Sequence, residues 1–247
     1  MRWTWRLTVS YDGTAYAGWQ VQRGGPPTVQ GLLAEAARRL CGPTARVTGA
    51  SRTDAGVHAL GQVVSLVTDT VHGAEAVRGA LNAALPPDVR VMRVEPAPPG
   101  FDARRAAVAK RYLYLIDNAR VASPLLHRFA WHVPAPLDVA AMRAALASLR
   151  GRHDFSAFRA SAGRDKAPVC EVRAAHVVRR RDRVALLVSA DRFLHHMVRV
   201  IVGSAVEVGR GAREPAWVGQ VLASRDRRIA GPTAPAHGLV LLCVVYG

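Results

Sequence analysis

The spacing of the apolar residues changes along the chain in an order that restricts the fold. Residues 3–11 alternate apolar with polar side chains, which is typical of a half-buried strand. Thr28 is a candidate N-cap for a helix whose apolar residues recur at helical spacing, with Gly42 just past its end. The later elements of this half are predicted as strands at 46–50 and 62–68, a helix at 75–85 and a strand at 89–94.

The rest of the chain repeats this order of elements. Its predicted elements are a strand at 108–116, a helix at 137–149, strands at 171–178 and 184–190, helices at 193–208 and 215–224, and a strand at 239–246. Two β-α-β-β-α-β units, each a ferredoxin-like half, account for this order most simply. We therefore expect an α+β protein with halves at 1–100 and 101–247, joined at the Pro- and Arg-rich stretch 96–105. A central basic cleft between the halves would be the default site.

The charge of the chain indicates a polyanionic partner. Lys and Arg number 34 against 18 Asp and Glu, which gives a formal charge of +16. Only Lys110 and Lys166 are lysines, so a bias toward Arg codons could explain the choice of Arg but not the excess over acidic residues. Nucleic acid is the first partner to consider.

The cysteines and the hydropathy indicate a reducing compartment. Cys41, Cys170 and Cys243 are odd in number and far apart, which argues against a disulfide framework or a zinc site. The first residues lack the apolar core of a signal peptide, and no apolar run is long enough to span a membrane. We expect a cytoplasmic protein without a membrane partner.

The segment from Gly49 to Ala59 could carry chemistry. In an extended stretch Arg52 and Asp54 point the same way, and a nearby guanidinium keeps a carboxylate ionised and available as a nucleophile. An ordinary turn, in which the arginine is only a salt-bridge partner, explains the same spacing and is favoured by spacing alone.

Five motifs resemble the successive signatures of the tRNA pseudouridine synthase A family. They are YDGTAYAGWQVQ (11–22), SRTDAGVHALGQVV (51–64), KRYLYLI (110–116), GRHDFSAF (151–158) and FLHHMVRVIVG (193–203). They follow the family's order, and the resemblance runs from about Trp5 to the C-terminus. It implies a pseudouridine synthase fold and an isomerase that converts uridine to pseudouridine at positions 38, 39 and 40 of the tRNA anticodon stem and loop, working as a homodimer. The isomerisation needs neither cofactor nor metal, and the sequence has no P-loop, dinucleotide fingerprint or metal-ligand cluster.

The resemblance assigns roles to four catalytic residues. Asp54 corresponds to the nucleophile, and Arg52 to an arginine that helps to hold the flipped nucleotide out of the stack. Tyr112 corresponds to the tyrosine that stacks on the uracil, although packing against the sheet would also explain a strand tyrosine, and Tyr114 shares its face. Arg199 corresponds to the arginine that pairs with the nucleophile, with a solvated helix arginine as the alternative.

Further residues are predicted to contact the substrate. Leu239 matches a leucine that lines the base pocket, although it could be an ordinary strand residue. The segment Phe101, Asp102, Ala103, Arg104 and Arg105 resembles the family's contact with the tRNA backbone. Arg159, Arg164 and Lys166 lie in a loop suited to phosphate contacts, where the chain departs from the family pattern.

Two other features are interpreted as non-catalytic. His195 and His196 are adjacent on a predicted helix, where side chains diverge by about 100°, so they are not expected to bind one metal ion. The run of charges at 179–183 is interpreted as a solvated hairpin turn rather than an RNA-binding patch.

Three rival functions remain. They are a non-catalytic RNA-binding protein that keeps the fold, a pseudouridine synthase that acts on ribosomal RNA, and a metal-dependent nuclease. Retention of all four catalytic residues argues against the first. The absence of room for an added RNA-binding module argues against the second, and the lack of clustered carboxylates argues against the third.

Overall fold

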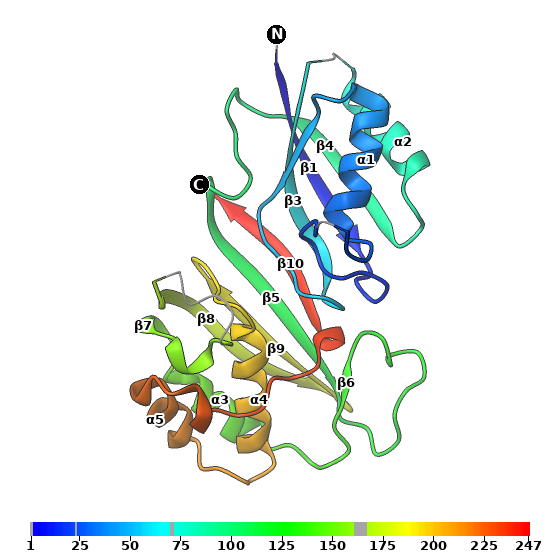
Figure 1. The fold of residues 1–247 in the computed structure, drawn as a ribbon. Helices are drawn as coiled ribbons and strands as arrows, with labels where there is room; N and C mark the ends of the chain where they lie inside the picture. Colours follow the sequence, from blue (N-terminus) through cyan, green and yellow to red (C-terminus); the bar gives the residue numbers. More distant parts are fainter. Residues whose placement is uncertain (1, 23, 70–71, 161–166) are drawn as a thin grey trace. The chain divides into compact units, whose positions relative to one another are not determined.

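The protein consists of two compact units, which are drawn in Figure 1. The computed structural model describes residues 2–22, 24–69, 72–160 and 167–247. Unit 1 comprises Met1–Val108 and Val240–Gly247, and unit 2 comprises Ala109–Leu239. These units differ from the predicted halves 1–100 and 101–247 because the chain returns to unit 1 for its last strand.

Unit 1 has the predicted order of strands and helices. Its sheet runs in the order β4-β1-β3, and both β2 and β10 pair with β3. All these pairings are antiparallel except the one between β10 and β3. Helices α1 and α2 lie on one face of this sheet (Figure 1). The elements are β1 (Trp3–Tyr11), α1 (Val29–Cys41), β2 (Arg46–Gly49), β3 (His58–Thr68), α2 (Ala74–Ala84), β4 (Val89–Pro96) and β10 (Leu239–Tyr246).

Helix α1 begins at the N-cap that the sequence predicts. The Thr28 side chain accepts a hydrogen bond from the Gly31 N–H at 3.3 Å and so caps the helix. Strand β3 begins four residues before the predicted start at 62, because β10 pairs with its first residues, His58 and Ala59. A partner so distant in sequence leaves no local signal. The core between sheet and helices includes Leu7, Val9, Leu33, Leu66, Val77 and Leu81, all fully buried.

Unit 2 also mixes a sheet with helices, so the α+β fold class is confirmed. Its sheet has the order β5-β9-β8-β7, with the short β6 beside β5. The predicted order is present, with β6, β7 and three 3-10 helices added. The elements are β5 (Ala107–Asp117), β6 (Trp131–His132), α3 (Val139–Ala147), β7 (Gly151–Asp154), β8 (Val169–Arg180), β9 (Arg183–Ala190), α4 (Met197–Gly209) and α5 (Ala216–Ser224). The 3-10 helices are η1 (Ser156–Phe158), η2 (Arg227–Ile229) and η3 (Ala236–Gly238).

Helix α4 starts later than predicted. The sequence pattern placed its start at Phe193, whereas the helix begins at Met197. His196 has a φ of 60°, in the left-handed region, which cannot continue a right-handed helix. The error arose because Leu194, Met197 and Val198 are all buried and therefore keep the apolar spacing of a helix across the turn.

The charged run at 179–183 spans the hairpin turn between β8 and β9, as predicted. Its side chains are exposed, and Arg181 has a φ of 54°, which suits a tight hairpin connection. None of the helices described is both long and apolar enough to cross a membrane.

Candidate active site

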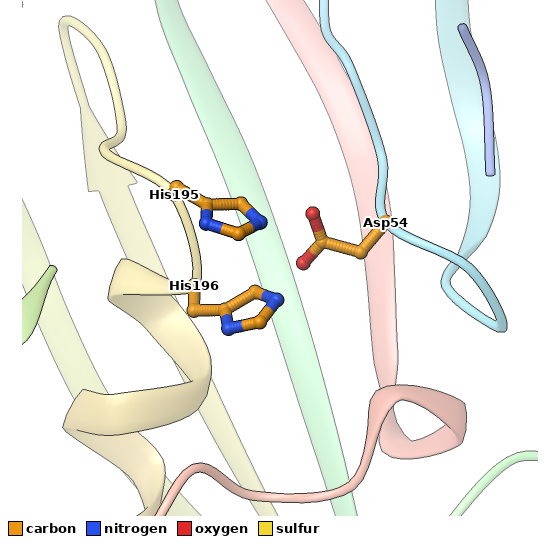
Figure 2. A group of neighbouring side chains, drawn as sticks. All are labelled: Asp54, His195 and His196. Atoms are coloured by element: carbon orange, nitrogen blue, oxygen red, sulfur yellow. The ribbon is translucent and has the colours of Figure 1, made fainter. Parts of the chain in front are cut away.

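Asp54 lies in the irregular loop that joins β2 to β3 (Figure 2). Along this loop Ser51 and Thr53 are buried, Arg52 is exposed and Asp54 is half-buried. This alternation agrees with the expected extended stretch, in which Arg52 and Asp54 share one side. The loop then turns back, and the Val57 N–H donates to the Asp54 carbonyl at 3.1 Å. The arrangement leaves Asp54 accessible while its neighbours are anchored in unit 1.

Thr53 anchors the middle of the loop from two directions. Its hydroxyl lies 2.7 Å from the hydroxyl of Tyr11 at the end of β1, and both side chains are buried. Its carbonyl accepts a hydrogen bond from the Trp19 N–H at 3.0 Å. Gly18 permits this approach, because it has a φ of 89° and a Cβ there would lie 2.6 Å from the Thr53 carbonyl oxygen. The YDGTAYAGW motif therefore holds the residue before Asp54.

Gln62 anchors the start of the same loop. Its Oε1 accepts from the Ser51 N–H at 3.1 Å, and its Nε2 donates to the Ser51 carbonyl at 2.7 Å. Its side chain is fully buried. The contacts of Tyr11, Trp19 and Gln62 were not predicted from the sequence. The available signal was a glutamine directly before the apolar run that ends β3, since a buried amide needs partners.

Tyr112 and Tyr114 lie on the same face of β5 but have different surroundings. The Tyr112 ring makes an edge-to-face contact with Phe193, with ring centroids 5.0 Å apart. Tyr114 is fully buried, and its hydroxyl donates to the Pro235 carbonyl at 2.8 Å. Burial raises the pKa of Tyr114 above its usual value, so the hydroxyl stays protonated. These contacts give Tyr114 a structural role and distinguish it from Tyr112.

Arg199, in the first turn of α4, is held by a segment far along the chain. Its Nε donates to the Ala234 carbonyl at 2.8 Å, and the Ala234 N–H donates to the Arg199 carbonyl at 3.1 Å. We call residues 231–235 the strap. The Gly231 N–H donates to the hydroxyl of the buried Ser204 at 3.0 Å, so the strap is bound to α4 at two levels. The half-buried Arg199 side chain is thus oriented through Nε.

Leu239 follows η3 and begins β10. It is 5% exposed, so the structure agrees with both the pocket-lining and the ordinary strand interpretations.

His195 and His196 lie in the turn before α4 rather than on the helix (Figure 2). Their ring centroids are 3.9 Å apart with an interplanar angle of 31°. The expected divergence of the two side chains is therefore wrong, because both residues precede the helix and His196 is left-handed. That the protein needs no metal stays a prediction.

The segment 101–105 is built to present two arginines. The Phe101 and Tyr246 rings pack with centroids 5.6 Å apart, and the Tyr246 hydroxyl donates to the carbonyl of the fully buried Ala103 at 2.8 Å. The Asp102 carboxylate accepts from the backbone N–H groups of Arg104 and Arg105 at 2.8 and 2.9 Å. Both arginine side chains are exposed.

The predicted contact residues after η1 are only partly described. Arg159 is half-buried, and its backbone N–H donates to the Ser156 carbonyl at 3.2 Å. Arg164 and Lys166 lie outside the described residues.

Comparisons with known proteins agree with the motifs. The family model described as tRNA pseudouridine synthase matches residues 7–104 and 145–247. A protein named tRNA pseudouridine synthase A from Myxococcus xanthus is 48% identical over 242 residues, which cover 98% of this chain and 91% of that protein. Proteins of the same name from Methylobacterium nodulans and Moorella thermoacetica are 46% and 44% identical, each over 98% of this chain and over 95% and 98% of their own lengths. The chain therefore belongs to the tRNA pseudouridine synthase family.

Proposed function

We propose that Asp54 is the nucleophile with which this tRNA pseudouridine synthase isomerises uridine. The observation that carries the proposal is the Asp54 loop itself. Its backbone is held at Ser51 by the buried Gln62 and at Thr53 by the buried Trp19, while Asp54 stays partly accessible. Preorganised placement of a reacting group is a large part of catalysis, because misplacement by about 1 Å can cost roughly 10²-fold in rate.

The reaction needs no imported group. The bond between N1 of uracil and C1′ of ribose breaks, the base turns, and a bond forms between C5 and C1′. The proton on C5 leaves and N1 gains one, so the product has the same atoms and the same oxidation state as the substrate. A carboxylate that bonds transiently to the substrate divides this exchange into easier steps.

The other site residues receive roles from the family resemblance. We assign Arg52, which is exposed beside Asp54 in the loop, to hold the target nucleotide out of the stack. Tyr112 would stack on the flipped uracil and accept the C5 proton, and Leu239 would line the base pocket. Arg199 would supply positive charge that stabilises the carboxylate form of the nucleophile.

We assign the reaction to uridines at positions 38, 39 and 40 of the anticodon stem and loop. A cytoplasmic location is supported by the cysteines, since no disulfide links Cys41, Cys170 and Cys243, all three of which the structure describes.

The proposed homodimer has a candidate surface in unit 2. Alternate residues of β5 and β9 are buried, and the intervening aliphatic residues Leu113, Leu115 and Leu187 are half-buried. Val178 on β8 is 57% exposed on the same face, since its strand neighbour Ala185 pairs with Leu115. An aliphatic sheet face of this kind suits contact with a second copy. Light scattering on the purified protein should give a dimer mass, and a monomer mass in Val178→Arg. A monomeric wild type would remove this part of the proposal.

The test of the nucleophile is tritium release from a tRNA transcript that carries C5-tritiated uridine. Wild type should release tritium with EDTA present, and Asp54→Asn should release none above background. The matched control is Asp69→Asn, which makes the same chemical change at an exposed residue and should keep wild-type activity. Pseudouridine should then map to positions 38–40.

Each rival has its own outcome in this assay. An inactive wild type that still binds the transcript would favour a non-catalytic RNA-binding protein. Release from a ribosomal RNA fragment but not from tRNA would favour the ribosomal enzyme. Activity that EDTA abolishes, accompanied by strand cleavage, would favour the nuclease.

The arginines of segment 101–105 are proposed to contact the tRNA backbone. Replacing Arg104 and Arg105 together with Ala should weaken tRNA binding and lower the slope of log K against log salt by about 2, because each phosphate contact contributes about 0.9. The matched control replaces Arg180 and Arg181, which are equally exposed in the hairpin turn, and should leave the slope nearly unchanged. Equal effects of the two pairs would show that net charge, rather than segment 101–105, governs binding.

A further inference from the structure

Gln62 is a buried polar residue of β3 that binds the loop carrying Asp54. It is 0% exposed, and both polar atoms of its side chain bond to one backbone residue, Ser51. Ser51 stands 11 residues earlier in the chain and three before Asp54. Because Oε1 can only accept and Nε2 can only donate, the pair of bonds fixes both the position and the orientation of the Ser51 peptide groups.

The adjoining residue extends this connection into the sheet. The Ala50 N–H donates to the Val63 carbonyl at 2.8 Å, so Ala50 and Ser51 are bound to the consecutive residues Val63 and Gln62 of β3. Ser51 cannot shift along the strand without breaking both amide bonds, and each unmet buried group carries a desolvation cost. The start of the loop is therefore fixed to β3, whose main chain is itself bonded to β1.

Unit 1 contains a second side-chain amide that bonds twice to one backbone residue, as Gln62 does; we call each such pair of bonds a clamp. The second clamp serves as a control, because it lies away from the Asp54 loop. Asn82 in α2 donates from Nδ2 to the Val91 carbonyl and accepts at Oδ1 from the Val91 N–H, both at 2.8 Å. This clamp joins α2 to β4 and makes no bond to the Asp54 loop. Comparing variants of Gln62 and Asn82 shows whether loss of a clamp lowers only the stability of the fold or also the rate of the reaction.

We propose that Gln62 is a positioning residue for catalysis, which sets the location of the Asp54 carboxylate by clamping Ser51. The inference rests on the proposed role of Asp54 as the nucleophile. Gln62 itself touches no reacting atom and acts only through the backbone of the loop. Its loss should therefore slow the chemical step without weakening the binding of tRNA.

The experiment compares Gln62→Glu with Asn82→Asp. Each change keeps the shape of the side chain and replaces the donating amide nitrogen with a carboxylate oxygen, which repels the backbone carbonyl that it faces. Single-turnover tritium release gives the rate of the chemical step, filter binding gives the Kd for tRNA, and thermal melting gives the stability. In Gln62→Glu we expect the rate constant to fall on the order of 10²-fold, with the Kd within about twofold of wild type. Asn82→Asp should melt earlier but keep the wild-type rate constant.

A second variant decides the question if Gln62→Glu does not fold. Gln62→Met has a similar length and buries no charge, but makes neither bond to Ser51, so it should show the same loss of rate at unchanged Kd. A wild-type rate constant in either folded Gln62 variant would overturn the inference, and so would an equal loss of rate in Asn82→Asp. Asp54→Asn is measured alongside: if it remains active, the proposed nucleophile fails, whereas an inactive Asp54→Asn with an active Gln62→Glu refutes only the inference drawn from Gln62.

Discussion

The two units hold their proposed catalytic residues by different means. In unit 1, Asp54 lies on an irregular loop. Its backbone is bonded to Trp19 and Gln62, and the side chain of Thr53 is bonded to Tyr11 of β1. In unit 2, Tyr112 and Arg199 belong to a regular strand and a regular helix, so the register of β5 and the turn of α4 already determine where they point. Residues distant in sequence add contacts to both: Phe193 packs against the Tyr112 ring, and the strap binds Arg199.

This difference predicts how substitutions act. A loop without its own hydrogen-bond ladder depends on each external bond, so a single change to one of its bonding partners should move Asp54. A residue on a regular element is supported by many ladder bonds, so only changes to the side chain itself, or a large displacement of the strap, should matter.

The largest effect is expected from Tyr112 itself. Tyr112→Phe keeps a ring that can stack on the base but removes the hydroxyl, and we expect kcat to fall on the order of 10²-fold, as for loss of a general base. Tyr114→Phe removes a hydroxyl from the same strand face and leaves the Pro235 carbonyl without its donor. It should cost about 1 kcal/mol of stability and change kcat by less than about threefold.

Steady-state kinetics and urea unfolding are measured on both variants. A large loss of kcat in Tyr114→Phe but not in Tyr112→Phe would make Tyr114 the catalytic tyrosine.

An intermediate effect is expected from displacing the strap. Gly203 in α4 lies against the strap so closely that a Cβ would stand 1.8 Å from the Pro232 carbonyl oxygen. Gly203→Ala should push the strap away from Arg199, with a stability loss of about 1–3 kcal/mol and a fall in kcat of roughly tenfold.

The control for this change is Gly219→Ala in α5. A Cβ there meets the Ser148 side chain at an ordinary 3.5 Å, so the better helix propensity of Ala should stabilise the protein by up to about 1 kcal/mol. Both variants are compared by urea unfolding and kcat. If Gly203→Ala keeps the wild-type kcat, Arg199 does not depend on the strap.

The smallest effect is expected from the hydroxyl of Tyr11. Tyr11→Phe removes its contact with Thr53, one of several that hold the loop, and should lower kcat by about fivefold at unchanged Kd for tRNA, the equivalent of about 1 kcal/mol. Tyr16→Phe removes a comparable bond, from the Tyr16 hydroxyl to the Asp88 carboxylate at 2.6 Å, which does not involve the loop. Its kcat should stay at the wild-type value. Equal losses in the two variants would contradict the view that bonds to the loop have a special effect.

The same contrast explains how much the sequence could predict. Periodicity placed β1, α1, α2, β5 and β10 closely, and the motifs located the proposed catalytic set, because each of these signals is local. The late start of α4 was not predicted, since one residue in the left-handed conformation does not change the apolar spacing.

The supporting contacts could not be predicted from sequence. Gln62 stands 11 residues from Ser51, Tyr11 stands 42 from Thr53, and Arg199 stands 35 from Ala234, so no window of a few residues includes both partners. They depend on strand register and on the path of the strap, which arise only when the sheet has assembled.

The assignment of β10 to unit 1 has a consequence for synthesis of the protein on the ribosome. Residues 240–247 emerge after all of unit 2, yet β3 needs them to pair His58 and Ala59, and the hydroxyl of Tyr246 fixes Ala103. The first unit therefore cannot complete its fold while the nascent chain still lacks this strand, even though most of its residues have long left the exit tunnel. Contacts of such high sequence separation slow folding, so the pairing of β10 with β3 should be a late step in the folding of unit 1.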